Sequence, residues 1–221
     1  MRSVRMLSLI TLILVAGCSR AKTSSQVDLH FALDPAPCLF EGNRILLPQL
    51  SGTVASRKTA VTKWTVYLPD DVPVNTAIDL FSQFEKAECM NVAVYAEDAN
   101  GERAKRDICL TVWPDGPVHI STEVTTNHTD ALKQYTELVA QFEKAQCTVG
   151  KSGQDLLTAR CQLNDLAPIL RPLLAMCSEK RVRVMEAGGV EGMPGRRYSE
   201  VLEILKQLGV EKVSFYGVYV E

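Results

Sequence analysis

The stretch TAIDLFSQFEKAEC, residues 76–89, decides the fold of this chain, because similar stretches occur twice more. It aligns without gaps with QYTELVAQFEKAQC, residues 134–147, and six of the seven letters in the closing heptad are identical. A third stretch, YSEVLEILKQLGV, residues 198–210, fits the same frame. Apolar residues recur at helical spacing in each copy, so each copy predicts an amphipathic helix.

The first and third copies lie between short β-rich runs and are 121 residues apart. The runs are WTVYL (64–68), MNVAVYA (90–96), KRVRVMEA (180–187) and EKVSFYG (211–217). Pro73 and Pro194 precede the two helices at equivalent positions, as a helix start signal should. The pattern predicts an α+β fold in which repeated β-α-β units form small mixed sheets with amphipathic helices on one face.

The remaining segments predict further strands, turns and one more helix. VDLHFAL (27–33) and NRILLPQL (43–50) are strand candidates, and Asn100-Gly101 and Asp115-Gly116 predict hairpin turns. A helix is expected over 164–177, with Pro172 inside it. The segments group into two α+β modules, residues 27–103 and 104–221.

The N-terminus indicates an exported protein. Arg2 and Arg5 precede an apolar run that is too short to span a bilayer and has the proportions of a signal peptide. The run ends in V-A-G-C, residues 15–18, which resembles the lipobox of bacterial lipoproteins. The resemblance implies a signal peptide over 1–17, lipid on Cys18 and a polar tether over 18–26. The alternatives are an ordinary signal peptide cut nearby or an uncleaved anchor.

Localisation and charge narrow the range of partners. The lipid would anchor the chain in a membrane leaflet, facing the periplasm. The resemblance to lipoproteins also implies the outer membrane, because Ser19 stands where an aspartate is linked with retention in the inner membrane. The formal net charge of −2 becomes more negative when the signal peptide leaves with its two arginines. Since no basic face is indicated, nucleic acid is not an expected partner. No cofactor motif occurs.

Six cysteines besides Cys18 lie in a chain that is expected to enter an oxidising compartment, so three disulfides are predicted. Zinc is the alternative, but no C-x-x-C pair occurs, and we expect no metal. Six cysteines allow fifteen pairings. The repeat favours the set Cys38–Cys89, Cys109–Cys147 and Cys161–Cys177.

The best candidate for a ligand site is the loop GGVEGMPGRR, residues 188–197. Its glycines leave backbone N–H groups accessible, and two arginines follow where a helix begins, which favours an anion. The predicted binding residues are Gly189, Gly192, Gly195, Arg196 and Arg197. The alternative is a flexible crossover loop with solvated arginines, since the spacing matches no phosphate-binding motif.

Residues 146–221 resemble the periplasmic domain of the ExbD/TolR family. The resemblance rests on an apolar strand, a tyrosine-led helix and a Gly-Val step into the last strand: Val182, Val184, Tyr198, Val201, Leu205, Gly209, Val210, Val213 and Phe215. Family members carry a transmembrane helix with an aspartate used in proton-driven energy coupling, and this chain has the lipobox instead. The resemblance implies the fold and binding in the envelope, without proton translocation.

No catalytic motif emerges from the sequence, because no G-x-S-x-G occurs and none of the histidines has a recognisable partner. We therefore expect a non-enzymatic binding or scaffold module that contacts an envelope protein or peptidoglycan. A link to an ExbD/TolR-type complex or to the cell wall is the specific form of this expectation. The alternative is a small-molecule or anion-binding lipoprotein that uses residues 188–197.

Overall fold

The computed structural model of the chain describes residues 26–32, 38–40, 43–96, 108–123, 148–151, 156–176, 180–187 and 192–217, with Glu137 and Ala140. Cys18, the turn expected at Asn100-Gly101, most of the heptad copy at 134–147 and the module boundary after 103 lie outside these residues. Among the residues described, no helix is long and apolar enough to cross a membrane.

The first sheet has five strands in the order β3-β2-β1-β4-β6. They are β1 (Gln26–Phe31), β2 (Cys38–Phe40), β3 (Asn43–Ile45), β4 (Lys63–Leu68) and β6 (Val92–Ala96). β1, β4 and β6 run parallel, and β2 and β3 are antiparallel to their neighbours. Alternate residues of β1, such as Leu29 and Phe31, are buried, so one face of this sheet packs on the core.

The second sheet repeats this arrangement and adds a strand at each edge. Its strands are β5 (Val72–Pro73), β7 (Ile108–Val112), β8 (Val118–Glu123), β9 (Thr148–Lys151), β10 (Leu156–Cys161), β11 (Arg181–Glu186) and β12 (Lys212–Gly217). The order is β5-β12-β11-β7-β8-β10-β9. Without β5 and β9, the order β10-β8-β7-β11-β12 matches the first sheet strand for strand.

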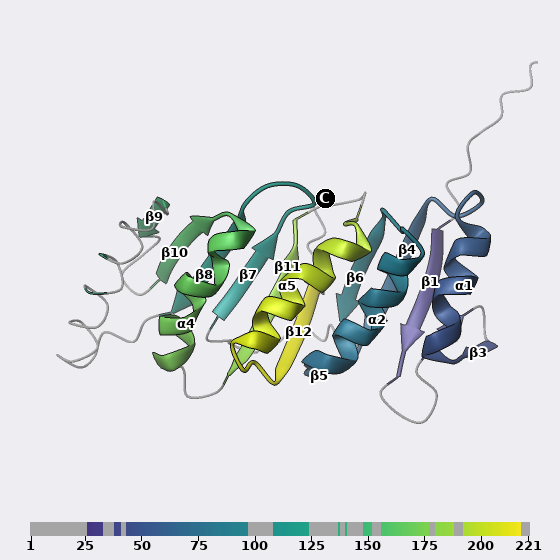
Figure 1. Cartoon of the computed structure of the whole chain (residues 1–221), viewed down its shortest axis with the longest axis horizontal. Coiled ribbons are helices and arrows are strands. Elements are labelled where there is room, and N and C mark those ends of the chain that lie inside the picture. The colour runs from purple at the N-terminus through teal and green to yellow at the C-terminus, as the bar shows by residue number, and fades with distance from the viewer. Residues whose placement is uncertain are drawn as a thin grey trace, which may run out of the picture.

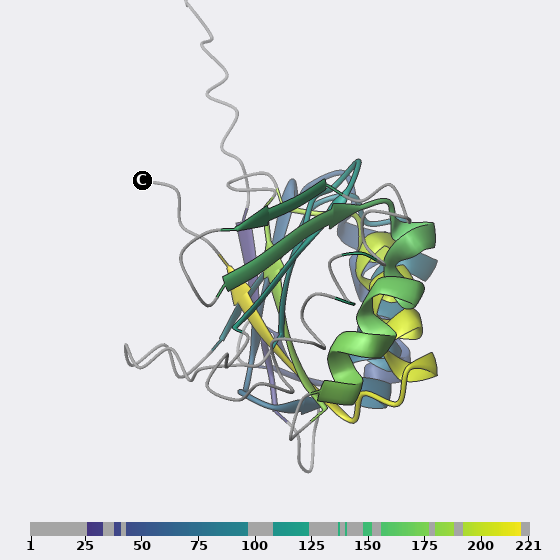
Figure 2. The same ribbon diagram turned by 90° about the vertical axis from the view of Figure 1, so that its left-hand side faces the viewer.

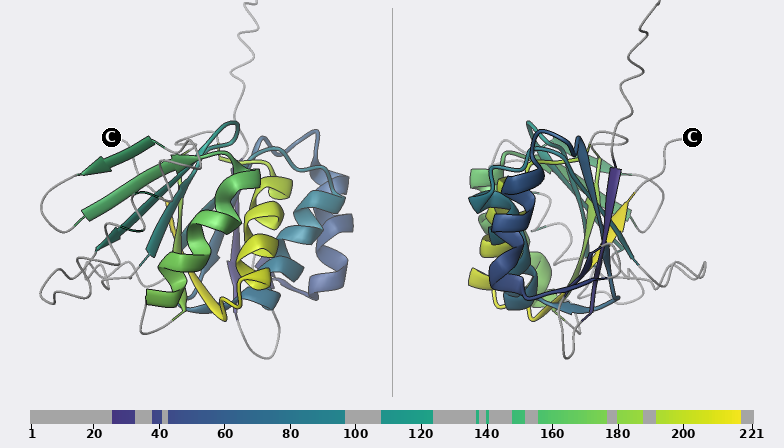
Figure 3. Two further views of the ribbon diagram at one scale, coloured as in Figure 1. Left: turned by 60° about the vertical axis from the view of Figure 1, so that its left-hand side comes forward. Right: turned by 90° about the vertical axis from the view of Figure 1, so that its right-hand side faces the viewer.

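The helices lie on one face of the strands. They are α1 (Leu47–Arg57), α2 (Val74–Lys86), α4 (Leu166–Met176, after the short helix η1, Leu163–Asp165) and α5 (Gly195–Gln207). Figures 1 and 2 show the strands as one curved layer with these helices along one side, and Figure 3 shows the same layering from two further directions. The predicted fold class, α+β with repeated β-α-β units, is confirmed.

An internal two-fold relation connects the units β4-α2-β6 and β11-α5-β12. Helix α2 begins at Val74 and α5 at Gly195, which is the offset of 121 residues seen in the sequence. Proline N-caps both helices with nearly the same backbone angles. At the other end, Glu88 and Gly209 both have positive φ, the left-handed conformation that often ends a helix. The two units therefore share their boundaries as well as their order.

The half of the molecule that contains β1 to β6 and the half that contains β7 to β12 exchange backbone contacts. These contacts lie along a seam where α2 and α5 pack antiparallel. Val72 pairs with Val213, and Val92 pairs with Met193, so the two bridges are also related by the 121-residue offset. In addition, the Gly195 N–H donates to the Cys89 carbonyl at 2.9 Å. Each half thus completes the hydrogen bonding of the other.

Aromatic side chains fill the seam beneath the helices. The rings of Phe81 and Tyr198 stack with centroids 4.4 Å apart, and Phe215 lies 5.4 Å from Phe81. The residues equivalent to Phe81 and Tyr198 in the other half are Leu202 and Ala77, and all four are buried. A large residue in one half therefore corresponds to a smaller one in the other, and the seam is not symmetric in its side chains.

The prediction of a strand over 43–50 is wrong beyond Ile45, because helix α1 begins at Leu47. Pro48 lies in the first turn, where its missing N–H costs no hydrogen bond. Leu50 and Val54 then place buried side chains one turn apart. The hairpin at Asp115-Gly116 is confirmed, since β7 and β8 pair antiparallel and Gly116 has a φ of 107°.

Candidate functional site

The predicted glycine-rich loop lies at the seam, where its glycines allow the halves to approach. Gly189 lies outside the described residues. Gly192 has a φ of 76°, and a Cβ there would lie 2.9 Å from the Val92 carbonyl. A Cβ on Gly195 would lie 2.7 Å from the Phe84 Cβ. Both described glycines are therefore explained by close backbone packing, without a ligand.

The two arginines of this loop bind groups of the chain itself. The Arg197 Nε and Nη2 donate to the carbonyls of Trp113 and Gly116, at 3.2 and 2.6 Å, and so fasten the β7–β8 hairpin to the start of α5. The Arg196 Nε donates to Glu200 at 2.8 Å. Both arginines already have acceptors within the chain, which weakens the predicted anion site.

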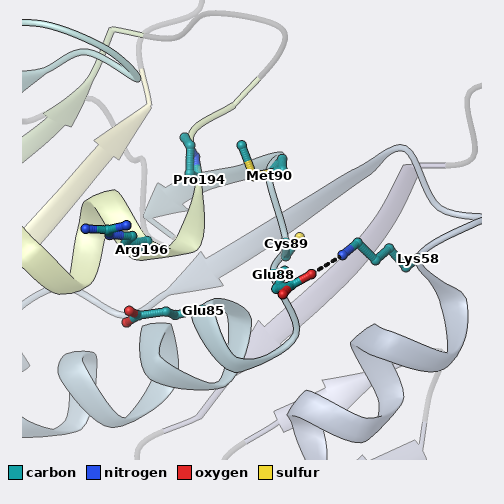
Figure 4. A pocket seen from close by; sticks show the side chains of 7 residues that line it. All are labelled: Lys58, Glu85, Glu88, Cys89, Met90, Pro194 and Arg196. Atoms are coloured by element: carbon teal, nitrogen blue, oxygen red, sulfur yellow. Dashed lines mark hydrogen bonds and ion pairs between the residues drawn. The ribbon is translucent and has the colours of Figure 1, made fainter.

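A pocket of about 430 Å³ opens beside this loop, at one end of the seam (Figure 4). We call it the seam pocket. Its lining comes from the end of α1, from the end of α2 with the turn into β6, and from the start of α5: Lys58, Glu85, Glu88, Cys89, Met90, Pro194 and Arg196. The two-fold packing of α2 against α5 thus creates a concave site that neither half has alone.

The seam pocket combines an apolar part with charged side chains, of which Lys58 and Glu88 pair with each other. Met90 is 63% exposed and lies near Pro194 at one rim, as Figure 4 shows. At the opposite rim the Lys58 Nζ lies 3.0 Å from a Glu88 carboxylate oxygen. Because these charges neutralise each other, the free energy available to a ligand comes chiefly from covering apolar surface.

Cys89 lines the pocket as a buried thiol. Burial raises the pKa of Cys89, and the backbone of Asn91 and the charge of Lys58 offset this only in part. The thiol is therefore protonated at neutral pH and is a weak nucleophile. Among the residues described, no cluster of three or more His, Cys, Asp or Glu side chains is arranged to hold a metal ion.

The structure does not bring together the predicted pair Cys38–Cys89, and both residues are thiols in it. Cys38 pairs with Phe31 at the end of β1, whereas Cys89 lies just before β6, level with the starts of β1 and β4. Along the strand direction, Cys38 and Cys89 are therefore four to five residues apart, a distance of roughly 13–16 Å. A disulfide needs Cα atoms within about 7 Å.

The other predicted pairs involve Cys147 and Cys177, which lie outside the described residues. Cys109, expected to pair with Cys147, is a thiol in the structure, and burial raises its pKa to about 11. Burial likewise raises the pKa of Cys38, to about 12. Cys161 lies in β10, and its sulfur is 3.8 Å from the Val118 carbonyl oxygen.

A carboxyl group that no sequence motif marks is buried between β11, β6 and α5. Glu186, at the end of β11, accepts hydrogen bonds on Oε2 from the Tyr198 hydroxyl at 2.8 Å and from the Val94 N–H at 3.2 Å. Its Oε1 is buried and has no hydrogen-bond partner within the described part of the chain. Val182 and Val184 alternate with Glu186 toward the core, and this alternation was the available signal.

We expect Glu186 to make stability depend on pH. Burial raises the pKa of Glu186 above its ordinary 4.5, although Tyr198, Val94 and Lys63 oppose the shift. The folded protein therefore holds the proton on the Glu186 carboxyl more tightly than the unfolded chain does. The contribution of this group to the free energy of unfolding is complete below pH 4.5 and is lost as the pH rises through the folded-state pKa. Glu186→Gln should therefore flatten the curve of unfolding free energy against pH, measured by urea denaturation between about pH 4 and 8.

The exposed Glu203 on α5 provides the control. Glu203→Gln removes the same charge from an exposed position and so corrects for the change in net charge. If the Glu186→Gln curve runs parallel to that of the parent, Glu186 titrates alike in the folded and unfolded states and the expectation is wrong.

Comparison with known proteins adds no family to this description. No protein-family model matches the chain, and no curated protein is significantly similar to it. The lipobox and the likeness to ExbD/TolR domains therefore remain predictions from the residues named above.

Proposed function

We propose that the chain is a lipid-anchored, non-enzymatic binding module of the bacterial cell envelope and that it holds another envelope component at the seam pocket. The observation that supports this is the character of the pocket, which offers an apolar rim while its two cations, Lys58 and Arg196, each pair with a carboxylate of the chain. Covering apolar surface is favourable by about 25 cal/mol per Å². A small anion would instead have to compete with Glu88 for Lys58 and with Glu200 for Arg196.

The lipobox at Cys18 supports the envelope location. The likeness of residues 146–221 to ExbD/TolR domains supports a scaffold role beside an envelope protein, peptidoglycan or an energy-transducing complex. The protonated Cys89 thiol supports binding rather than catalysis, because the most nucleophilic side chain type in the pocket is held in its unreactive form.

The test is site-specific photo-crosslinking in cells that produce the complete chain. A photoreactive amino acid replaces Met90 at the pocket rim, and in a matched variant it replaces Leu46, which is 56% exposed at the start of α1. We expect adducts with an envelope component from position 90 and none from position 46, with the adducts identified by mass. Equal yields at both positions, or none at position 90, would contradict the proposal. Cys18→Ser separately tests the anchor, since it should release the chain from membranes.

A further inference from the structure

We propose that one end of the folded domain rests on the bilayer, with Met90 and Trp113 in contact with lipid. This end, called the tether pole, is where β1 begins at Gln26. The inference rests on the proposed lipid anchor. The envelope component that contacts the rim of the seam pocket is then the membrane surface itself.

The strand registers place the pocket rim at the tether pole. Gln26 lies beside Lys63, the first residue of β4, and Trp64 lies beside Val92. Met90 precedes Val92 by two residues and therefore lies at the same end. In Figure 1 strands β1, β4 and β6 all begin at this end of the molecule.

The β7–β8 hairpin brings Trp113 to the same pole. β7 runs parallel to β11, and Val92 bridges Met193 in the segment between β11 and α5. Arg197 then holds the Trp113 and Gly116 carbonyls against the start of α5. Trp113, 42% exposed, is thus presented on a fastened hairpin near the pocket.

The length of the tether keeps this pole close to the lipid. Only eight residue steps separate Cys18 from Gln26, and a chain spans at most about 3.3–3.6 Å per residue. The start of β1 must therefore lie within about 28 Å of an acylated Cys18. If the opposite end of the domain faced the membrane, the tether would have to run back along β1 for about 20 Å, which is most of its reach.

The chemistry of the pole fits an interfacial contact that does not depend on anionic lipid. Tryptophan favours the boundary between headgroups and acyl chains, where its ring is apolar and its N–H remains solvated. The two basic groups that line the pocket are already paired, Lys58 with Glu88 and Arg196 with Glu200. The contact should therefore respond weakly to salt and to the fraction of anionic lipid, unlike a polybasic patch.

Tryptophan fluorescence tests the contact directly. The chain has two tryptophans, and Trp64 is only 2% exposed in the core, so changes on membrane binding report on Trp113. The lipidated full chain is placed on phosphatidylethanolamine–phosphatidylglycerol vesicles with brominated acyl chains. We expect quenching by the bromolipid that disappears in Trp113→Phe, and loss of acrylamide access to Trp113 relative to the detergent-solubilised chain.

Two surface variants test which end of the domain contacts the membrane. Met90→Asp should reduce the bromolipid quenching, whereas Leu46→Asp should not, since Leu46 is comparably exposed at the opposite end of the molecule. Equal access of acrylamide to Trp113 on vesicles and in detergent, without bromolipid quenching, would overturn the inference. If the parent chain, as well as its Cys18→Ser variant, does not float with vesicles, the lipid anchor is refuted instead. Failure of the membrane contact and failure of the anchor are therefore distinguishable.

Discussion

Gly195→Ala should destabilise the protein by about 3 kcal/mol, because the new methyl group has no room at the seam. It would lie 2.7 Å from the Phe84 Cβ and 3.0 Å from the backbone of Phe84 and Glu85. These atoms belong to helix α2 rather than to the end of a flexible side chain, so relief requires the two helices to move apart. The measurement is the free energy of unfolding from urea denaturation.

Gly52→Ala is the matched control, because Gly52 also lies in a helix but has no atom within 4 Å of the place that a methyl group would take. There the better helix propensity of alanine should stabilise the protein by up to about 1 kcal/mol. The two substitutions are chemically identical and should change stability in opposite directions. A Gly195→Ala protein as stable as its parent would show that α2 and α5 do not pack as closely as described.

Phe81→Ala should cost about 3–5 kcal/mol, the range for removing a fully buried aromatic side chain. The Phe81 ring contacts Tyr198 and Phe215, which belong to the other half of the molecule. The loss therefore falls on the seam as well as on the first half. Urea denaturation followed by both fluorescence and circular dichroism should show one shifted transition, since the buried residues of both halves form one cluster.

The control for Phe81→Ala is Lys86→Ala, an exposed position on the same helix, where a change within about 0.5 kcal/mol is expected. A double-mutant cycle between Phe81 and Tyr198 should give a coupling energy of about 0.5–1.5 kcal/mol. A coupling energy of zero would contradict the stacked contact across the seam.

The sequence predicted the repeated unit because its signals are local. Pro73 and Pro194 mark the helix starts, and the 121-residue offset brings equivalent strands and helix ends into register. Helix α1 was missed because the short apolar run before Pro48 carries no period that separates strand from helix. Local propensity alone could not reveal that Leu50 and Val54 pack against the sheet.

The candidate site was only partly predictable, because its contacts span the chain. The sequence located Arg197 at a helix start, but its acceptors at Trp113 and Gly116 lie more than eighty residues earlier. Similarly, Lys58, Cys89 and Pro194 come from three segments that meet only when the halves pack. The repeat spacing that favoured the pair Cys38–Cys89 likewise carries no information on how far along a sheet each residue lies.

The internal two-fold relation connects two units of different sequence, so the two ends of the seam can carry different side chains. In a homodimer of identical subunits, any residue placed at one end of the seam must appear at the other end as well. Here the position equivalent to Met90 is Glu211, and the position equivalent to Arg196 is Asn75. Joining both units in one chain frees each end to change alone and makes their association independent of protein concentration. The two ends of the seam therefore differ in character, with the apolar side chain of Met90 at one end and the carboxylate of Glu211 at the other.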